Sequence, residues 1–216
     1  MVNSVHKKYL EIAAEYVKGD DWLAVNTYED KTEGVTKFPD MRELPLVGVS
    51  DNTYQGVYSE HFIEHLTKSQ GENFLKEMFR ILKPGGVIRT VWPAQEFVTK
   101  LLSDEPLTDE EKYFCREYHK IYCVNWTFYP PEYENASERQ QIAGALSYQK
   151  GEHKYLWGES ELIEKLKEIG FVVAKLHEYQ QSRIKDFTNI DTQEEIRRIH
   201  SSVVEAQKPS TRTDHE

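Results

Sequence analysis

Hydrophobic positions change their spacing most clearly between Val57 and Pro93. Polar and apolar residues alternate at the start of this stretch and again over residues 87–92, which predicts a strand at each end. Pro93 ends the second strand because proline cannot donate a hydrogen bond to a strand ladder. Between the strands, apolar residues recur at helical spacing at Phe74, Leu75, Met78, Phe79 and Leu82. The pattern predicts one strand–helix–strand unit.

Local signals mark both ends of this predicted helix. Thr67 and Gln70 have the spacing of a capping box, in which each residue satisfies a backbone donor of the other. At the far end, residues 83–86 read Lys-Pro-Gly-Gly, which supplies a cation, a helix breaker and two residues that tolerate left-handed backbone. The helix is therefore predicted to lie between these two signals.

Shorter apolar runs predict the remaining strands. Residues 9–14 are expected to form a first central strand and residues 22–26 a second. The roughly eight residues between them leave room for no more than about one turn of helix. Apolar residues on one face of residues 161–169 predict a helix, with Gly170 as its cap before a strand. Residues 201–209 are predicted to form the last strand, which pairs antiparallel with the strand that follows Gly170.

Residues 94–155 form a long segment after the central unit. Helices are predicted to begin at Glu96 and at Asp109, and two prolines at 130 and 131 interrupt the helical pattern beyond them. We expect an α-rich insert that acts as a lid or substrate-binding region. Its aromatic residues suit a flat or partly apolar acceptor, such as a sugar or aromatic ring, but they equally suit the core of an added subdomain. The sequence leaves both interpretations open.

Size and charge limit the classes of function. At 216 residues, the chain fits one domain over residues 1–216 that carries the insert at 94–155, with a polar, frayed tail at 210–216. Its 27 Lys and Arg residues against 37 Asp and Glu residues argue against a surface built for nucleic acid. Because no apolar segment is long enough to cross a bilayer, we expect a soluble cytoplasmic protein with no membrane partner. The oligomeric state is left open.

Cysteine and histidine recur every four residues at Cys115, His119 and Cys123. On a helix the two cysteines would lie roughly 12 Å apart along the axis, which is too far to share one ion. Two cysteines are also too few for a disulfide framework. We therefore interpret the three as a structural face and expect no metal site.

The central unit resembles the second half of class I S-adenosylmethionine-dependent methyltransferases. The resemblance rests on Glu64-His65-Leu66 after the first strand and on Leu82-Lys83-Pro84-Gly85-Gly86 one helix later. It extends to a subgroup of small predicted methyltransferases with a minimal N-terminus, a long insert and a His/aromatic element before the final helix. The resemblance implies a Rossmann-like α/β fold: a mostly parallel twisted sheet with one antiparallel strand, helices on both faces and an α-rich insert.

In this family the first strand ends in an acidic residue and a glycine-rich turn that approaches the cofactor closely. Glu11 matches the acidic position, whereas Ala13 and Glu15 stand where glycines are expected. Alanine fits at modest cost where φ is negative, but Glu15 would bring bulk and charge beside the cofactor. Asn26 replaces the usual ribose-binding carboxylate and could hold one hydroxyl. The resemblance thus implies that Glu11, Ala13, Ala14 and Asn26 border S-adenosylmethionine.

The resemblance also places the following loop at the adenine of the cofactor. Asp40 corresponds to the family's adenine-facing aspartate, with Met41 and Arg42 beside the ring. A solvated loop carboxylate at Asp40 is an equally good interpretation.

Three residues end the fourth strand, where open α/β sheets bind ligands. Ser59 and Glu60 would border the cofactor, and His61 is the candidate base because its ordinary pKa lies near neutrality. His61 could instead only hydrogen-bond across the strand end. Glu64 and His65 lie beyond the strand, and we interpret them as structural.

The resemblance implies transfer of a methyl group from S-adenosylmethionine, by in-line displacement, to a small-molecule or saccharide acceptor. The altered turn and Asn26 support an alternative, an inactive methyltransferase-like protein that binds a partner. A Rossmann dehydrogenase is disfavoured because no G-x-G-x-x-G motif follows any predicted strand.

Overall fold

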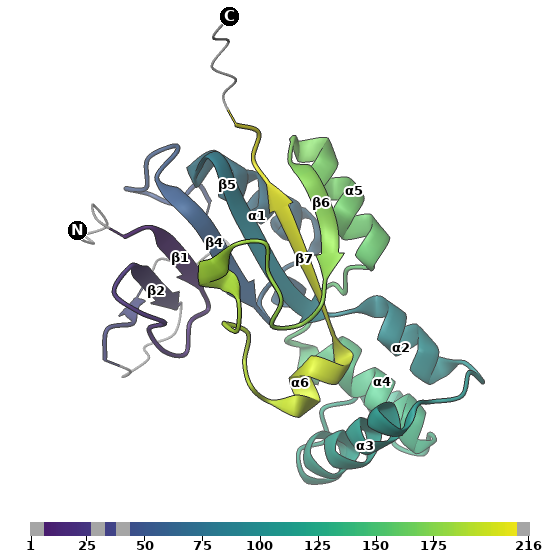
Figure 1. Cartoon of the computed structure of the whole chain (residues 1–216). Helices are drawn as coiled ribbons and strands as arrows, with labels where there is room; N and C mark the ends of the chain where they lie inside the picture. The colour runs from purple at the N-terminus through teal and green to yellow at the C-terminus, as the bar shows by residue number, and fades with distance from the viewer. Residues whose placement is uncertain (1–6, 27–32, 38–43, 211–216) are drawn as a thin grey trace, which may run out of the picture.

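The computed structural model describes residues 7–26, 33–37 and 44–210, which are arranged around a seven-stranded sheet (Figure 1). The strands lie in the order β3-β2-β1-β4-β5-β7-β6. Only β7 runs antiparallel to its neighbours, which confirms the predicted mostly parallel sheet. The strands are β1 (Tyr9–Ile12), β2 (Trp22–Asn26), β3 (Thr36–Lys37), β4 (Tyr54–Glu60), β5 (Leu82–Pro93), β6 (Val172–His177) and β7 (Ser201–Gln207).

The predicted strand–helix–strand unit is present as β4, α1 (Lys68–Ile81) and β5. Thr67 caps α1 with the expected capping box, in which Oγ1 accepts from the Gln70 N–H and the Gln70 side chain accepts from the Thr67 N–H. Gly85 has a φ of 78°, as the predicted left-handed turn requires. The β5 strand begins at Leu82, five residues earlier than its alternating pattern indicates, because Leu82 already pairs with β4.

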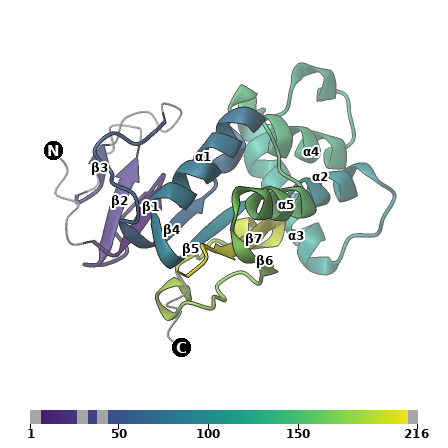
Figure 2. The ribbon, with the colours of Figure 1, turned by 90° about the horizontal axis from the view of Figure 1, so that it is seen from above.

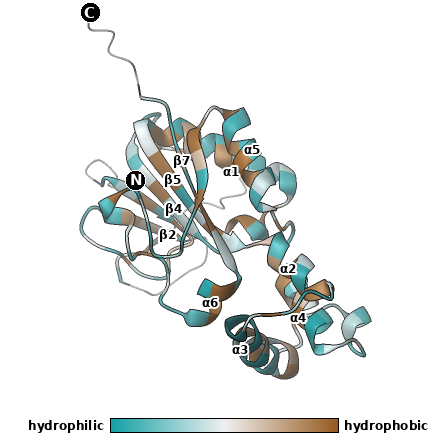
Figure 3. Cartoon of the chain, turned by 45° about the vertical axis from the view of Figure 1, so that its right-hand side comes forward, coloured by the Kyte–Doolittle hydropathy of each residue, from teal (hydrophilic) through white to brown (hydrophobic). Residues whose placement is uncertain are grey.

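One face of the sheet is covered by α1 and by α5 (Glu159–Ile169), which lie behind the sheet in Figure 1. Strand side chains on this face are apolar, among them Leu10, Val57 and Ile88, and they share one buried cluster with Phe74 of α1. Figure 3 shows apolar stretches along the central strands, whereas the helices alternate between apolar and polar surface. Burial of these apolar side chains is the main force that holds the two helices on the sheet.

The opposite face of the sheet is covered in a different way. In the described part of the chain it is covered by residues 178–194, which link β6 towards β7 and contain one 3-10 turn at Lys185–Phe187. Phe187 is fully buried, with its ring 5.6 Å from that of Tyr9 and 5.5 Å from that of Trp22. The short β1–β2 connection contains no helix, in keeping with the length predicted for it, so an irregular segment with a 3-10 helix covers the described part of this face.

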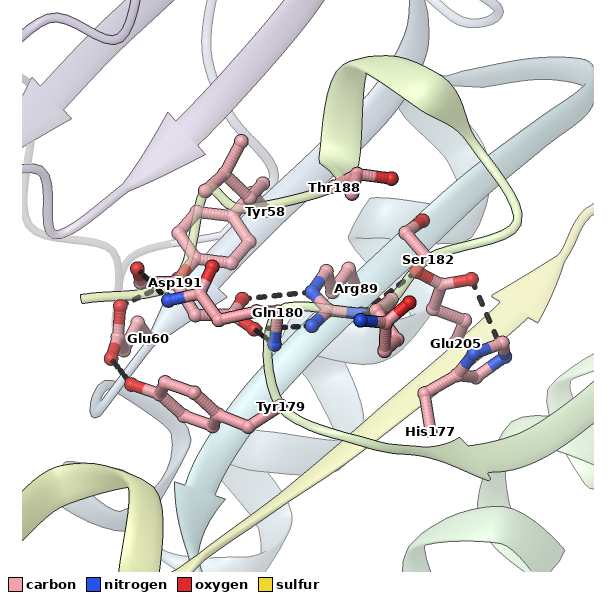
Figure 4. Close-up of polar contacts among 12 residues, drawn as sticks. Tyr58, Glu60, Arg89, His177, Tyr179, Gln180, Ser182, Thr188, Asp191 and Glu205 are labelled. Atoms are coloured by element: carbon pink, nitrogen blue, oxygen red, sulfur yellow. Dashed lines mark hydrogen bonds and ion pairs between the residues drawn. The ribbon is translucent and has the colours of Figure 1, made fainter. Parts of the chain in front are cut away.

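A buried ionic network fastens this covering segment to the sheet (Figure 4). Arg89 of β5 donates from Nε to Asp191 at 2.8 Å and from Nη1 to Glu205 of β7 at 2.9 Å. It also donates to the backbone carbonyl of Gln181 at 2.8 Å. All three charged side chains are completely buried. On this face, paired charges thus add to the apolar contacts that hold the segment on the sheet.

The insert forms a separate layer of helices at one end of the sheet (Figure 2). It contains α2 (Gln95–Leu102), α3 (Asp109–Tyr118), a π-helical extension (His119–Asn125) and α4 (Glu138–Tyr148) around its own apolar core. The short helix α6 (Glu195–His200) packs against this layer before β7 begins. Within the described ranges, no helix is both long and apolar enough to cross a lipid bilayer.

Candidate functional site

A cavity of about 270 Å³ lies between the carboxyl ends of the central strands and the insert. The chain order of the strands reverses between β1 and β4, which is where open α/β sheets bind their ligands. The sheet side of the cavity is formed by Ala13, Glu15, Glu60, His61, Glu64, His65 and Pro93. The insert contributes Tyr118, Tyr122, Leu146, Gln149 and His153, and α6 with the preceding Glu194 contributes Ile196, Arg197 and His200.

The turn after β1 keeps a left-handed backbone without glycine. Ala13 has a φ of 60°, a conformation that costs an L-residue roughly 1–2 kcal/mol and that glycine adopts freely. The modest cost expected for alanine here assumed a negative φ, whereas the φ of Ala13 in the structure is positive. Glu15 is exposed, and its carboxylate lies 3.4 Å from Arg197 Nη2 on α6. This ion pair draws the Glu15 charge towards the opposite wall of the cavity.

Two other predicted cofactor residues stabilise this turn. Ala14 is completely buried and does not line the cavity. The Asn26 side-chain amide donates to the Ala14 carbonyl at 3.0 Å. Asn26 thus links the end of β2 to the turn after β1.

Glu11 points away from the cavity, to the face covered by residues 178–194. Its carboxylate forms an ion pair of 3.2 Å with Lys18, whose ammonium lies 5.0 Å from the centre of the Tyr58 ring. Burial raises the pKa of Glu11 to about 7, and the nearby Lys18 only partly offsets this effect. Glu11 therefore packs against Lys18 on the covered face of the sheet and does not line the cavity.

The end of β4 places its three predicted residues in different surroundings. The Ser59 side chain is buried and donates to Thr90 at 3.3 Å, so it does not line the cavity. Glu60 lines the cavity, but its carboxylate accepts from the hydroxyls of Tyr58 at 2.5 Å and Tyr179 at 2.6 Å (Figure 4). It also accepts from the Thr192 backbone N–H at 3.0 Å. Glu60 thus anchors the covering segment.

His61 is in the cavity wall and is held from several sides. Its backbone has a φ of 49° and its N–H donates to the Val91 carbonyl at 2.9 Å. The ring Nε2 lies 2.9 Å from Ser201 Oγ, and Nδ1 lies 3.3 Å from Glu64 Oε1. A histidine oriented by a carboxylate in a cavity is an arrangement suited to proton transfer.

Glu64 is completely buried among histidines. Neither of its carboxylate oxygens has a hydrogen-bond partner among the described residues, since His61 lies at ion-pair distance without hydrogen-bond alignment. Burial by itself would raise the pKa of Glu64, but His61, followed by His153 and His65, outweighs burial and lowers the pKa to about 2. Glu64 is therefore a charged group inside the protein.

Two further histidines complete this side of the cavity. His153 Nδ1 lies 2.5 Å from the Leu146 carbonyl, and burial is the main cause that lowers the pKa of His153. His200 Nδ1 lies 2.7 Å from the Ile196 carbonyl, and burial followed by the nearby His61 lowers the pKa of His200 to about 3. Both imidazoles are therefore neutral at neutral pH. The sequence pattern assigned neither histidine to the site, because no local signal links them to β4.

The other predicted residues lie elsewhere. Asp40, Met41 and Arg42 fall outside the described residues. Among the regularly spaced Cys115, His119 and Cys123, the histidine Nε2 lies 2.8 Å from Gln141 Oε1, and the second cysteine is buried in the core of the insert. These three residues are not part of the cavity wall.

One family model matches part of the chain. Residues 9–90 match the family model described as a methyltransferase domain. Among solved structures, an S-adenosylmethionine-dependent methyltransferase from Archaeoglobus fulgidus superimposes with a TM-score of 0.51 at 18% identity, over 94% of this chain and 86% of that one. No curated protein matches the chain in sequence.

Two further solved structures are similar at lower scores. An S-adenosylmethionine-dependent methyltransferase from Thermotoga maritima has a TM-score of 0.48 at 15% identity, over 93% of this chain and 82% of that one. Phosphoethanolamine N-methyltransferase 2 from Haemonchus contortus, solved with S-adenosyl-L-methionine, has a TM-score of 0.45 at 14% identity, over 95% and 49%.

Proposed function

We propose that the chain is an S-adenosylmethionine-dependent methyltransferase of the class I fold that methylates a small polar acceptor, such as a saccharide; the methyltransferase family model over residues 9–90 and the similar solved fold support this. The acceptor would bind in the cavity between the strand ends and the insert. The observation that carries this proposal is that the cavity brings the turn after β1 and His61 after β4 into one wall.

When bound, S-adenosylmethionine would supply the methyl group that the acceptor oxygen or nitrogen receives. His61, whose ring is held between Ser201 and Glu64, would take up the acceptor proton. Most of the rate enhancement would come from holding the two reacting atoms in line and from excluding water. The insert supports this role, because Tyr118 and Tyr122 cover the cavity from the side opposite the strands.

The polar character of the cavity supports an acceptor that bears hydroxyl or amine groups. Its walls contain carboxylates, imidazoles, an amide and a guanidinium, and the tyrosine rings offer flat apolar surface. Sugars bind well to such sites because they present hydroxyls at their edges and apolar C–H groups on their faces. A lipid acceptor would leave these buried polar groups unpaired, at a cost of about 1–3 kcal/mol each.

An inactive protein that binds a partner is the competing function. Alanine at the left-handed residue 13, the charge of Glu15 and the lack of an acidic residue at position 26 favour it, since each departs from the pattern that the resemblance implies. A protein that has lost the cofactor would keep this fold, because the chain's own apolar side chains form the core beneath the cavity.

Isothermal titration of the full chain with S-adenosylmethionine and S-adenosylhomocysteine tests the proposal. We expect saturable binding of both, and an absence of binding to either would contradict an active enzyme. If the wild type does not bind, a chain with Ala13→Gly and Glu15→Gly shows whether those two side chains are the cause. With an acceptor in hand, His61→Ala should reduce methyl transfer by about 100-fold or more while cofactor binding is kept.

A further inference from the structure

We propose that Glu64, His65 and His153 bind one divalent transition-metal ion, specifically Zn²⁺, in the wall of the cavity. Each residue offers one ligand atom, and these atoms lie within 4.8 Å of one another. Two imidazoles and one carboxylate are a ligand set that zinc accepts readily and that leaves at least one coordination position open.

The spacing of the three ligand atoms suits one ion. Around a tetrahedral zinc ion, neighbouring ligand atoms lie about 3.3 Å apart, since each lies about 2 Å from the metal. The separations here are at most 4.8 Å, so the side chains need to move inward by only about 1 Å each. By contrast, Cys115 and Cys123 are unsuited to binding one ion, because eight residues of helix would separate them by roughly 12 Å along the axis.

Glu64 is the strongest single indication of a bound cation. Its side chain is completely buried, and both oxygens lack a hydrogen-bond partner among the described residues. A buried carboxylate without such partners costs several kcal/mol. A divalent cation bound to Glu64 would compensate its charge.

His153 is oriented as metal-binding histidines usually are. Its Nδ1 lies 2.5 Å from the Leu146 carbonyl, which can only accept, so Nδ1 carries the proton. The lone pair is therefore on Nε2, and a backbone carbonyl that fixes the tautomer in this way is a common outer partner of a zinc ligand. The fixed ring is a second observation, independent of Glu64, that points to the same ligand.

The backbone holds the two ligand-bearing segments together before any ion binds. The Glu64 carbonyl accepts from the Lys154 N–H at 2.7 Å and from the Tyr155 N–H at 3.2 Å. The rings of His65 and His153 meet edge to face, with 4.9 Å between their centres. A preformed arrangement of this kind reduces the entropy that metal binding would otherwise cost.

All three ligands line the cavity, so the open coordination positions of the ion face the space in which an acceptor would bind. A water molecule or an acceptor hydroxyl there would become more acidic beside the ion. Metal binding itself does not depend on the proposed methyl transfer, and it can be measured without S-adenosylmethionine.

The test is a titration of the metal-free, untagged full chain with Zn²⁺, followed by isothermal calorimetry and by elemental analysis after gel filtration. Co²⁺ serves as a spectroscopic probe, because its visible absorption bands report coordination by nitrogen and oxygen. The variants are His65→Ala, His153→Ala and Glu64→Gln, each checked by circular dichroism for a native thermal transition. The matched control is His119→Ala, which removes an imidazole of the insert that lies 2.8 Å from Gln141 Oε1 and outside the cavity wall.

We expect one Zn²⁺ per chain, an affinity at least about tenfold lower in each folded ligand variant, and wild-type affinity in the control. Absence of stoichiometric binding would overturn the proposal, as would binding that His65→Ala and His153→Ala both retain. Loss of binding in His119→Ala would also overturn it by placing the ion in the insert. Cofactor titration of the same metal-free protein separates a failure of this site from a failure of the proposed methyl transfer.

Discussion

The two faces of the central sheet are stabilised in different ways. On one face, α1 and α5 bury a continuous apolar cluster against the strands. On the other face, residues 178–194 pack a few aromatic side chains against the strands. Ion pairs of Arg89 with Asp191 and Glu205 hold this segment in place. Apolar packing tolerates many substitutions of similar volume, whereas a buried ionic network fails when one partner is removed. Stability should therefore be more sensitive to single changes on the second face.

The largest effect should come from Arg89→Met, which leaves Asp191 buried without its cation and Glu205 with only the more distant Arg183 and His177, at 3.6 Å and 3.4 Å. We expect the free energy of unfolding in urea to fall by about 3–5 kcal/mol. The exposed pair of Lys112 and Asp109, 2.9 Å apart, gives the control: Lys112→Met should cost at most about 1 kcal/mol. Equal losses in the two variants would remove the distinction between a buried network and a surface ion pair.

Glu11 should make stability on the same face depend on pH. Its pKa is raised to about 7 in the folded protein, so the folded chain holds a proton that the unfolded chain releases near pH 4.5. The resulting stabilisation is complete below pH 4.5 and is lost as pH rises through 7, by up to about 3 kcal/mol. Glu11→Gln should therefore gain stability relative to wild type over this range.

Urea unfolding of both proteins at several pH values between 4.5 and 7 measures this difference. The exposed Glu105 gives the control, since Glu105→Gln should shift stability equally at all these pH values. A constant difference between wild type and Glu11→Gln would show that Glu11 is not the source of the pH dependence.

A smaller effect compares one glycine from each face. A methyl group at Gly56, under the covering segment, would lie 2.5 Å from Phe187 Cζ, whereas one at Gly71 of α1 would lie 3.1 Å from Trp157 Cζ2. Gly56→Ala should cost about 1–3 kcal/mol through overpacking. Gly71→Ala should be close to neutral, because a gain of roughly 1 kcal/mol in helix propensity offsets the tight contact.

Thermal and urea unfolding of the two alanine variants test this comparison. Combining Gly56→Ala with Phe187→Leu should cost less than the sum of the two single changes, because the smaller side chain makes room for the methyl group. Simple additivity would mean that the clash with Phe187 is not what limits residue 56.

The last expected effect on stability is a small gain at Ala13, in the turn that follows β1. Ala13→Gly should stabilise the protein by about 0.5–1 kcal/mol, because relief of the left-handed backbone outweighs the added freedom of the unfolded chain. Asn52, with a φ of 56°, is the control, since asparagine tolerates this conformation and Asn52→Gly should gain less. A loss of stability in Ala13→Gly would show that Ala13 is not strained.

The core unit of the fold was predictable because its signals are local. The capping box at Thr67 and Gln70, the break at residues 83–86 and the cap at Gly170 each depend on neighbouring residues, and all three are present. The segment 178–194 was not predicted, because it forms neither a periodic helix nor an alternating strand. Its role depends on contacts between Arg89 and residues far away in the chain.

The candidate site divides in the same way. The resemblance identified the strand ends, and Ala13, Glu60 and His61 do line the cavity. Glu64 and His65 were interpreted as structural, since nothing nearby in the sequence shows that His153 returns to them. The backbone bonds from residues 154 and 155 to Glu64 create that meeting, and they exist only in the folded chain.

The sequence by itself determined the central strand–helix–strand unit, the strands beside it, the end of the sheet at which the cavity lies and the family to which the central unit is similar. Local periodicity, caps and turns carry that information, because they depend on residues within a few positions of one another. Tertiary structure alone decided how the second face is covered, which predicted residues reach the cavity and which histidines surround Glu64. These outcomes depend on packing between distant segments, which no local pattern records.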